Sequence, residues 1–509
     1  MKSSYPYLIL AILVLSFFWS CSNNEVKETT NNAKVSVDKK AQVYIELIEA
    51  VNSKDTIVLK DAILKHWSDT LIGQDNRWLT TDMNYWIAFN MEFGPLKFIS
   101  YGDDEYNENK VAWFKGIISN DWIGLEFDFT KDNRIDRTNV LRSCSPSHLE
   151  AVKPAKTITI YAQAFEAYFK KMEAANLFSG VVLIAKGDEI LHKKGYGFSD
   201  REMHEGFSSS QKMVIASTTK MFTTVAIAQL IEQGKLDLNT PISTYLDDFP
   251  DHIGDQVTLA HLLTHTSGIE LDDIDGFMPA IRQARSIDEF YKLNLEYLPK
   301  MEFYEDFKTL KALNYSNENF DILGKLIEVR SGQNFYDYLF ENILKPLNMN
   351  NTGPIDMKND SLDIAMNYQI NREGTGNFDN GFRDKVHHSD LSYSRPAGSY
   401  YSTVDDLYAF MLAFNNNQLV NDKLRTEFTT KQVENLNIPI YKSWYGYGIY
   451  VNEREGLINY GHAGGLPGTS SRCEYYPELD IYVIVTSNYN GAANLAANYI
   501  GSEIAKRNN

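Results

Sequence analysis

The sequence contains few cysteines and few long apolar runs. Only Cys21, Cys144 and Cys473 occur among its 509 residues, too few and too dispersed for a disulfide framework or a thiolate metal site. Cys144 and Cys473 can pair only if the fold brings them together. The apolar run Leu8–Trp19 is shorter than the ~20 residues that a membrane-spanning helix needs. These absences exclude a disulfide-stapled domain and a polytopic membrane protein.

Basic residues are outnumbered by acidic ones, 49 against 67, which gives a formal net charge of -18. No long Lys/Arg run occurs, so the chain has no basic segment that would attract the phosphate backbone of a nucleic acid. We therefore expect no nucleic-acid partner. With 43% hydrophobic and 13% aromatic residues, the composition is typical of a folded soluble protein and excludes extensive disorder.

The N-terminus has the pattern of a secretory signal. A basic residue precedes the run Leu8–Trp19, and a small residue and Cys21 follow it, so we expect residues 1–20 to be a signal peptide. A cysteine in this place resembles a bacterial lipoprotein signal, which implies a lipid anchor on Cys21; an ordinary cleaved signal is the alternative. The polar residues 21–40 then form a tether. This predicts a lipoprotein of the bacterial cell envelope, periplasmic or on the outer surface, that contacts the membrane through Cys21.

Residues 41–150 predict a small α+β accessory domain. A helical pattern covers 43–64, and strand-like runs follow at 96–101, 110–118 and 122–129. Aromatic residues are dense here and either fill the core or form a stacking platform for sugar. The tryptophans concerned are Trp67, Trp78, Trp86, Trp113 and Trp122.

Residues 157–509 predict a second domain, after a linker at 145–156. A helix at 161–178 leads into a hairpin of two strands, Gly180–Lys186 and Glu189–Tyr196, joined by a Gly-Asp turn. Four further strands and a terminal helix close the chain, and the middle, 215–430, is mostly helical. The fold class is therefore α/β (α+β), an antiparallel sheet flanked by helices plus a helical subdomain, with a cleft where the two parts meet.

The strongest chemical signal is Ser217-Thr218-Thr219-Lys220, ahead of the apolar stretch 221–231. It predicts a buried helix with Ser217 at its N-terminus, where free backbone N–H groups favour a developing anion. Lys220 lies one turn on, within reach of the Ser217 hydroxyl. A serine needs a base to take its proton, and lysine can serve if burial lowers its pKa from about 10.4 towards 7. The pattern alone is weak, because it recurs at 36–39 and 209–212, and a helix N-cap is the alternative role of Ser217.

Two other segments supply polar groups. Tyr315 and Asn317 stand just before a predicted helix; Tyr315 can accept a proton if a cation lowers its pKa, and Asn317 can bind a substrate amide. The glycine-rich segment 461–465 lies between two predicted strands, where a substrate can approach backbone N–H groups as in an oxyanion hole. Each segment alone is weak evidence, since Y-x-N recurs at 450–452.

In this order the three segments resemble the serine β-lactamase and penicillin-binding-protein superfamily, in particular its class C-like branch of esterases and D-aminopeptidases. The resemblance extends over about residues 160–505 and implies a β-lactamase/transpeptidase-like fold. Further matches lie in register, namely Phe178–Ala185, Leu262–Gly268, Leu323-Gly324, Pro396–Gly398, Ser402–Leu407 and Pro467-Gly468.

The resemblance implies a role for each residue. Ser217 is the acylated nucleophile, Lys220 its activator and Tyr315 the general base or proton relay, and Lys220 and Tyr315 titrate as a coupled pair. The backbone N–H groups of Ser217 and Gly465 form the oxyanion hole. The expected substrate contacts are Asn317, His462, Gly464 and Gly465.

One departure concerns His462. Penicillin-recognising members carry Lys-Thr-Gly where this chain has His462-Ala463-Gly464, so the permanent cation and the hydroxyl that hold a carboxylate are missing. This argues against β-lactam hydrolysis and favours esterase, amidase or D-aminopeptidase-like activity. His462 is either a partly charged substrate contact near neutral pH or a polar residue of the cleft.

The sequence thus predicts a serine hydrolase that acts on a small-molecule or peptide-like acyl substrate, with no cofactor and no metal. A catalytically silent ligand sensor or cell-wall binding protein on the same fold is the alternative. His261 and His265 have the spacing of a zinc pair, but Leu262 stands where zinc-protease helices carry glutamate, so a structural role is favoured. His387-His388 predicts a loop near the cleft entrance. The sequence does not define an oligomeric state.

Overall fold

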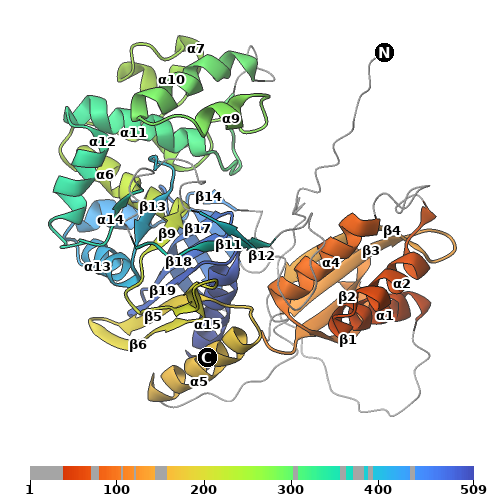
Figure 1. The fold of residues 1–509 in the computed structure, drawn as a ribbon. Helices are drawn as coiled ribbons and strands as arrows, with labels where there is room; N and C mark the ends of the chain where they lie inside the picture. Colours follow the sequence, from red (N-terminus) through yellow and green to blue (C-terminus); the bar gives the residue numbers. More distant parts are fainter. Residues whose placement is uncertain are drawn as a thin grey trace, which may run out of the picture.

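The chain folds into an N-terminal domain, residues 38–143, and a larger domain, residues 158–508 (Figure 1). The predicted signal peptide, Cys21, most of the predicted tether, the predicted linker, Cys144 and His388 lie outside the described residues. In the part of the chain that is described, no helix is long and apolar enough to cross a membrane. The computed structural model describes residues 38–69, 79–104, 107–119, 122–143, 158–301, 308–355, 363–370, 383–387, 394–435, 442–454 and 456–508.

The N-terminal domain packs helices against a four-stranded sheet. Asp38 and Asp55 cap the first two helices by accepting backbone N–H groups. The domain agrees with the predicted α+β pattern, but the sequence did not indicate α4 and β4. The elements are α1 (Lys39–Ser53), α2 (Thr56–His66), α4 (Leu79–Phe93), and the antiparallel strands β1 (Leu96–Asp104), β2 (Asn107–Gly116), β3 (Trp122–Phe129) and β4 (Ile135–Ser143) in that order.

The tryptophans of this domain mostly fill its core. Trp67 and Trp86 are buried in edge-to-face contact, with ring centroids 6.2 Å apart, and Trp122 is buried as well. Trp113 is half-buried, and Trp78 lies outside the described residues. This placement favours core packing over a sugar-stacking platform.

The larger domain is built on an eight-stranded antiparallel sheet with the order β14-β15-β16-β17-β18-β19-β5-β6. β5 and β6 form the hairpin predicted from the sequence, with the predicted bounds. β5 also pairs with β19, so the first and last strands of the domain are neighbours. The strands are β5 (Gly180–Lys186), β6 (Glu189–Tyr196), β14 (Val433–Glu434), β15 (Lys442–Tyr445), β16 (Tyr450–Arg454), β17 (Leu457–Leu466), β18 (Thr469–Tyr476) and β19 (Ile481–Ser487).

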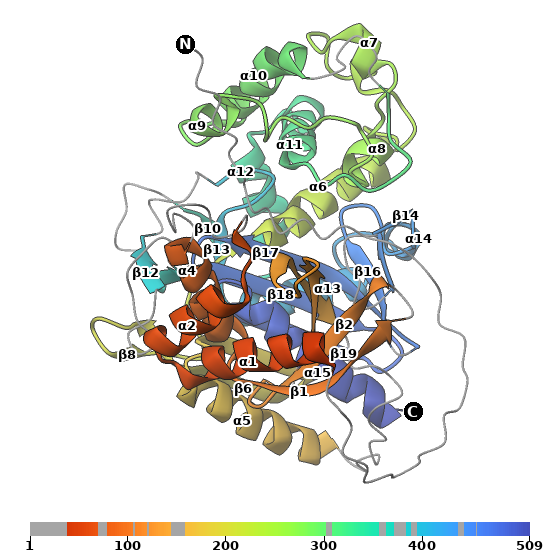
Figure 2. The same cartoon turned by 90° about the vertical axis from the view of Figure 1, so that its right-hand side faces the viewer.

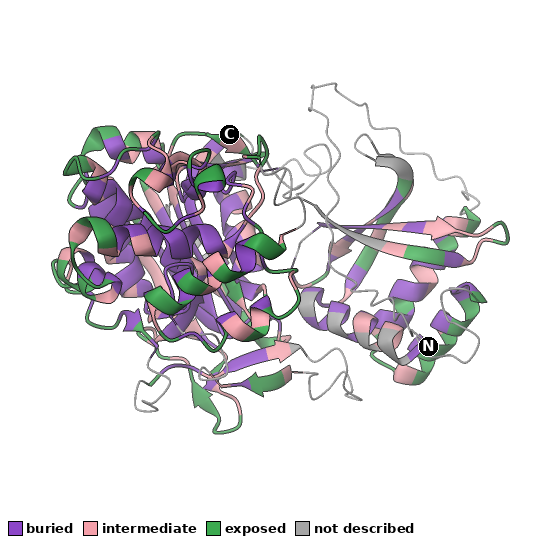
Figure 3. Cartoon of the chain, turned by 90° about the horizontal axis from the view of Figure 1, so that it is seen from above, coloured by how far each residue is buried: buried purple, intermediate pink, exposed green. Residues whose placement is uncertain are grey.

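Alternating side chains divide the core of this domain into two layers. On β5, Val181 and Leu183 pack against α6 (Lys220–Glu232) and α13 (Val404–Asn415), whereas Val182 and Ile184 pack against α5 (Ile158–Ala174) and α15 (Ala492–Asn508). Helices therefore cover both faces of the sheet (Figure 2). Figure 3 shows the buried residues gathered inside this layered body.

A helical subdomain packs on α6 and lies at the top of Figure 1. The predicted antiparallel sheet flanked by helices, with a helical subdomain beside it, is confirmed. The subdomain contains α7 (Asp251–Gly254), α8 (Leu259–Leu263), α9 (Phe277–Ile281), α10 (Ile287–Tyr297), α11 (Asn317–Ser331) and α12 (Phe335–Leu339). The remaining α-helix and strands are α14 (Asp422–Phe428), the pair β7 (Phe198–Asp200) and β8 (Glu205–Gly206), the sheet of β10 (Gly353–Pro354), β13 (Tyr400–Ser402) and β9 (Met213–Ala216), and the hairpin of β11 (Asn367–Ile370) and β12 (Arg383–Val386).

The glycine-rich segment 461–465 lies inside β17, not between two strands as its composition suggested. It pairs with β18 along its whole length, from Gly461 opposite Glu474 to Gly465 opposite Ser470. At Gly464 a Cβ atom would lie 2.1 Å from the carbonyl oxygen of Ile215 on β9. The glycine thus permits a close approach of two backbones.

The two domains are in contact. Arg383 of β12 donates from Nη2 to the Met91 carbonyl oxygen at 3.3 Å. Leu495 of α15 belongs to the hydrophobic core of the N-terminal domain. Gly94, at the end of α4, packs so closely on Leu177 that a Cβ atom would lie 2.8 Å from that side chain. Figure 1 shows the β11–β12 hairpin reaching towards the N-terminal domain.

Candidate active site

Ser217 follows a strained residue at the end of β9. Ala216 has φ 46° and ψ -130°, a conformation that residues other than glycine rarely adopt. Its carbonyl oxygen accepts hydrogen bonds from the Thr219 hydroxyl at 2.7 Å and from the Ser399 N–H at 3.3 Å, which hold the turn in place. The 3-10 turn Ser217–Thr219 leads directly into α6, so Ser217 stands at the N-terminal end of a buried helix and stays partly accessible.

Lys220 is completely buried one turn after Ser217. Its Nζ atom lies 3.2 Å from Ser217 Oγ, 2.8 Å from Asn317 Oδ1 and 2.6 Å from the Ala397 carbonyl oxygen. Burial, assisted by the positive charge of Arg395, lowers the pKa of Lys220 to about 7. The amine is therefore neutral in a large fraction of molecules near pH 7 and able to accept a proton.

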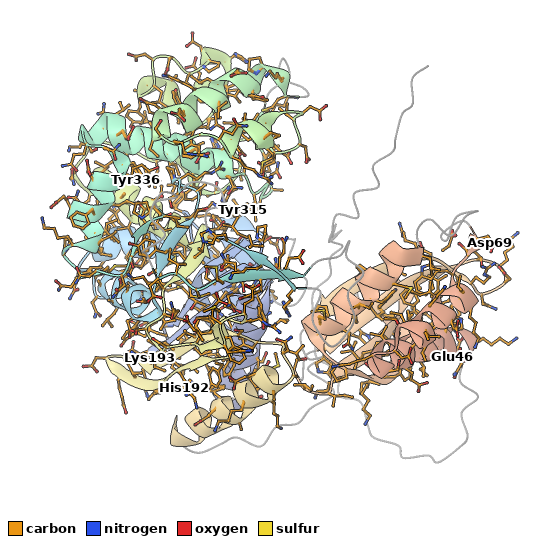
Figure 4. The ribbon with its side chains drawn as sticks, in the orientation of Figure 1. Glu46, Asp69, His192, Lys193, Tyr315 and Tyr336 are labelled. Atoms are coloured by element: carbon orange, nitrogen blue, oxygen red, sulfur yellow. The ribbon has the colours of Figure 1, made fainter. Side chains whose placement is uncertain are left out.

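Tyr315 brings its phenol to the same place from the loop before α11, where the helical subdomain meets the sheet (Figure 4). Lys220 Nζ lies 4.8 Å from the centroid of the ring. Burial raises the pKa of Tyr315 well above its ordinary value, while the neighbouring Ser217 side chain lowers it. The phenol is therefore protonated at neutral pH, which suits a proton relay.

Asn317 and two carboxyl groups come from α11. The Asn317 amide oxygen accepts the Lys220 hydrogen bond, and Glu318 and Asp321 form ion pairs with Arg395 at 3.7 and 3.3 Å. Burial raises the pKa of Glu318 to about 7 and that of Asp321 to about 6. Arg395 also begins the turn that contains the carbonyl acceptor of Lys220, so this arginine connects both supports of the amine.

Strand β17 forms the opposite side of the site. The Ser471 hydroxyl donates to the Ile215 carbonyl oxygen at 2.7 Å, so in its 2.8 Å contact with the Thr218 hydroxyl it is the acceptor. These bonds tie β18 to the turn of the nucleophile. Gly464 is buried against β9, whereas Gly465 is exposed, with nothing within 4 Å of the position of a Cβ atom. A ligand can therefore approach the backbone at Gly465.

His462 is buried and neutral. Its Nδ1 atom lies 2.6 Å from the Ala463 carbonyl oxygen, and because a carbonyl only accepts, Nδ1 carries the proton. Its Nε2 atom then accepts the Tyr445 hydroxyl at 2.9 Å. Burial, with repulsion from Lys220, lowers the pKa of His462 to about 3. Of the two roles expected for His462, this state favours the polar cleft residue over the charged contact.

The structure adds His265, Tyr445 and Arg395 to the surroundings of the site. The His265 ring stacks on Tyr315 with centroids 4.2 Å apart, and the Tyr445 ring lies edge-on to both. His265 falls in a segment that carried the resemblance and Arg395 directly precedes another, but no local pattern links them to the loop or helix that they contact. Co-variation between distant positions is the signal that would reveal such pairs.

The other candidates lie elsewhere. His261 Nδ1 accepts the Thr258 N–H at 3.1 Å and caps α8, so it does not form a pair with His265. Among the described residues, no group of three or more His, Cys, Asp or Glu side chains is placed to hold a metal ion. His387 follows β12, and Cys473 is a buried free thiol on β18.

Comparisons with known proteins show which family the chain belongs to. Residues 165–505 match the protein family described as Beta-lactamase. The chain is 29% identical over 319 residues to PbpX of Bacillus subtilis (strain 168), covering 62% of this chain and 72% of PbpX. It is 26% identical over 381 residues to a teichoic acid D-alanine hydrolase of Staphylococcus aureus, covering 70% and 83% of the two chains.

Among solved structures, a penicillin binding protein from Bacillus halodurans has a TM-score of 0.55 and 25% identity, covering 68% of this chain and 99% of that one. The family match spans more than half of the sequence and contains every part of the site described above. The chain therefore belongs to the beta-lactamase family, within the superfamily that serine β-lactamases share with penicillin-binding proteins.

Proposed function

We propose that this protein is a serine hydrolase that forms an acyl-enzyme on Ser217. The observation that supports it is the 3.2 Å contact between Ser217 Oγ and Lys220 Nζ, with the pKa of the amine lowered to about 7. Ser217 Oγ attacks the carbonyl carbon of an ester or amide, and its proton passes to neutral Lys220. The N–H groups of Ser217 and Gly465 donate to the oxyanion of the tetrahedral intermediate.

The intermediate then collapses and the bond to the leaving group breaks. Tyr315 donates its phenolic proton to the departing alcohol or amine and takes a proton from the Lys220 ammonium, so both residues return to their resting state. Water attacks the acyl-enzyme in the second half of the reaction, and the Ser217 hydroxyl is restored.

The expected substrates are esters or amides that need no cation to hold a carboxylate. The neutral state of His462 supports this choice, because no permanent charge stands at that position. Asp272 is exposed, and its negative charge raises the pKa of Lys220. This negative charge near the site favours a substrate with an ammonium group. D-alanyl esters have this chemistry, as does the substrate named for the Staphylococcus aureus relative, and we propose them as the first candidates.

A fluorophosphonate probe tests the nucleophile. We expect it to label the wild-type protein and to leave Ser217→Ala unlabelled. Ser209→Ala is the matched control, because Ser209 and Lys212 repeat the S-x-x-K spacing away from α6 and should label like wild type. Absence of labelling in folded wild-type protein would favour the catalytically silent sensor instead.

A substrate panel tests the chemistry of the acyl group. We expect hydrolysis of p-nitrophenyl esters and D-amino acid anilides, and none of a chromogenic cephalosporin. Efficient cephalosporin turnover would contradict the proposed role of His462.

We propose further that the protein is anchored in the bacterial cell envelope by a lipid on Cys21. The signal-like run ahead of this cysteine and the polar stretch after it support the proposal. The tether would place the hydrolase at the membrane surface, where its substrates would be envelope polymers or small acyl compounds.

A further inference from the structure

His265 occupies a strained and fully buried position just after α8. Its φ of 55° lies in the left-handed region, which is uncommon for residues other than glycine. Residues in such conformations often lie at functional sites, and the contacts of His265 indicate which function it serves.

Three contacts of His265 concern the loop that carries Tyr315, while its ring also lies against Phe320 and Tyr445. Its Nδ1 atom accepts the Ser316 N–H at 3.1 Å, and its carbonyl oxygen accepts the Asn314 N–H at 2.9 Å. The two residues on either side of Tyr315 are thus bound to one histidine. The ring between them stacks on the phenol ring, with centroids 4.2 Å apart and an angle of 29°.

His265 stays in one protonation state, so its hydrogen bond to the Tyr315 loop does not change near neutral pH. Burial lowers the pKa of the ring well below its ordinary value, and Lys220 and His462 lower it further. The ring is therefore neutral, and because Nδ1 is an acceptor, the proton is on Nε2. That Nε2 atom is buried and has no hydrogen-bond partner among the described residues. A buried N–H group without a partner lowers the stability of the fold. The fold tolerates this loss at a ring whose Nδ1 atom and face contact the Tyr315 loop and the Tyr315 ring.

We propose that His265 is a positioning residue that holds the Tyr315 phenol against Ser217. The inference rests on the proposed function, since it assigns a role within the same acylation step. His265 touches no substrate; it acts by fixing the backbone on both sides of Tyr315 and the plane of its ring. Loss of this support lets the phenol move, and a displacement of about 1 Å in a reacting group can cost on the order of 100-fold in rate.

A double-variant cycle on the rate of fluorophosphonate labelling tests this inference. Asparagine tolerates the left-handed conformation, but it has no ring to stack on Tyr315. We expect His265→Asn to slow labelling between about 10- and 100-fold, and Tyr315→Phe to slow it by at least as much. In the double variant, His265→Asn should cause no further loss, because the phenol that it positions is already absent.

His261→Asn is the matched control. This histidine caps α8 a few residues earlier and does not touch Tyr315, so its variant should lower the melting temperature slightly and label at the wild-type rate. If His265→Asn does not fold, His265→Phe replaces it in the same cycle, since it keeps a ring that can stack on Tyr315 and loses the Nδ1 acceptor of the Ser316 N–H. Losses that multiply in the double variant, or wild-type labelling by the single one, would overturn the inference. Failure of wild-type protein to label would instead refute the proposed function.

Discussion

Lys220 Nζ lies 3.2 Å from Ser217 Oγ, and the lysine side chain is fully excluded from solvent. Because the pKa of Lys220 is lowered to about 7, the neutral amine needed for proton transfer becomes more populated as the pH rises through 7. We expect the fluorophosphonate labelling rate to increase between pH 5 and pH 8 with an apparent pKa near 7 and then to level off.

Lys220→Arg is the companion variant, because a guanidinium does not lose its proton in this range. It should reduce the labelling rate by about 10² to 10⁴ at every pH. A wild-type rate that stays constant from pH 5 to 8 would show that the amine is not the base.

Arg395→Gln should both destabilise the protein and shift this pH profile. Without the guanidinium, Glu318 and Asp321 are buried without a cation, and such losses cost about 3 to 5 kcal/mol. The folded-state pKa values of these acids lie above their unfolded values, so their contribution to stability falls as the pH rises through about 6 to 7. Urea unfolding should therefore show a larger loss at pH 8 than at pH 5.

The same substitution removes a positive charge that lowers the pKa of Lys220, so the labelling profile should move to higher pH. Arg137→Gln is the control, because the Arg137–Asp128 pair is exposed and should be worth less than about 1 kcal/mol. Equal losses for the two arginine variants would argue against the buried network.

Two neighbouring glycines give a matched steric test. Gly464→Ala places a methyl group 2.1 Å from the Ile215 carbonyl oxygen, so β17 must move away from β9. We expect a loss of about 1 to 3 kcal/mol in stability and slower labelling. Gly465→Ala meets open space within the protein, so its stability should stay within about 0.5 kcal/mol of wild type, while its methyl group enters the space through which a ligand can approach the backbone. Differential scanning calorimetry and labelling would separate the pair, and inactivity of a stable Gly465→Ala variant would mean that substrate occupies that space.

Cys21→Ser tests the lipid anchor. The wild-type protein made in a bacterial host should partition into the detergent phase of Triton X-114, and the variant should move to the aqueous phase with unchanged labelling by the probe. Aqueous partition of the wild type would indicate an ordinary cleaved signal.

Local patterns in the sequence predicted the parts of the fold that depend on neighbouring residues. The β5–β6 hairpin was recognised by alternation and a Gly-Asp turn, and α6 by its apolar stretch after Ser217. β4 was not recognised, because it is an edge strand and its sequence is largely polar without a regular alternation of apolar residues. β17 was interrupted in the prediction by glycines that its pairing with β18 accommodates.

The sequence predicted the motif residues of the candidate site but not the contacts between its distant segments. Ser217 and Lys220 are three residues apart and share a helical turn, so their contact follows from helix geometry. The Ser316–His265 hydrogen bond joins positions 51 residues apart, and the Lys220–Ala397 bond joins positions 177 apart. Such contacts depend on tertiary packing, which periodicity and composition do not encode locally. The neutral state of His462 likewise required knowledge of its burial and of Tyr445.

Leu495 lies in the last helix of the chain and yet helps to fill the interior of the first domain. Neither domain can therefore lose its structure without uncovering apolar surface on the other. Heating should therefore unfold both domains in one calorimetric transition. A C-terminal domain produced without the N-terminal domain would expose an apolar surface around Leu495 and Leu177. A separately produced C-terminal domain should therefore self-associate more readily than the full chain.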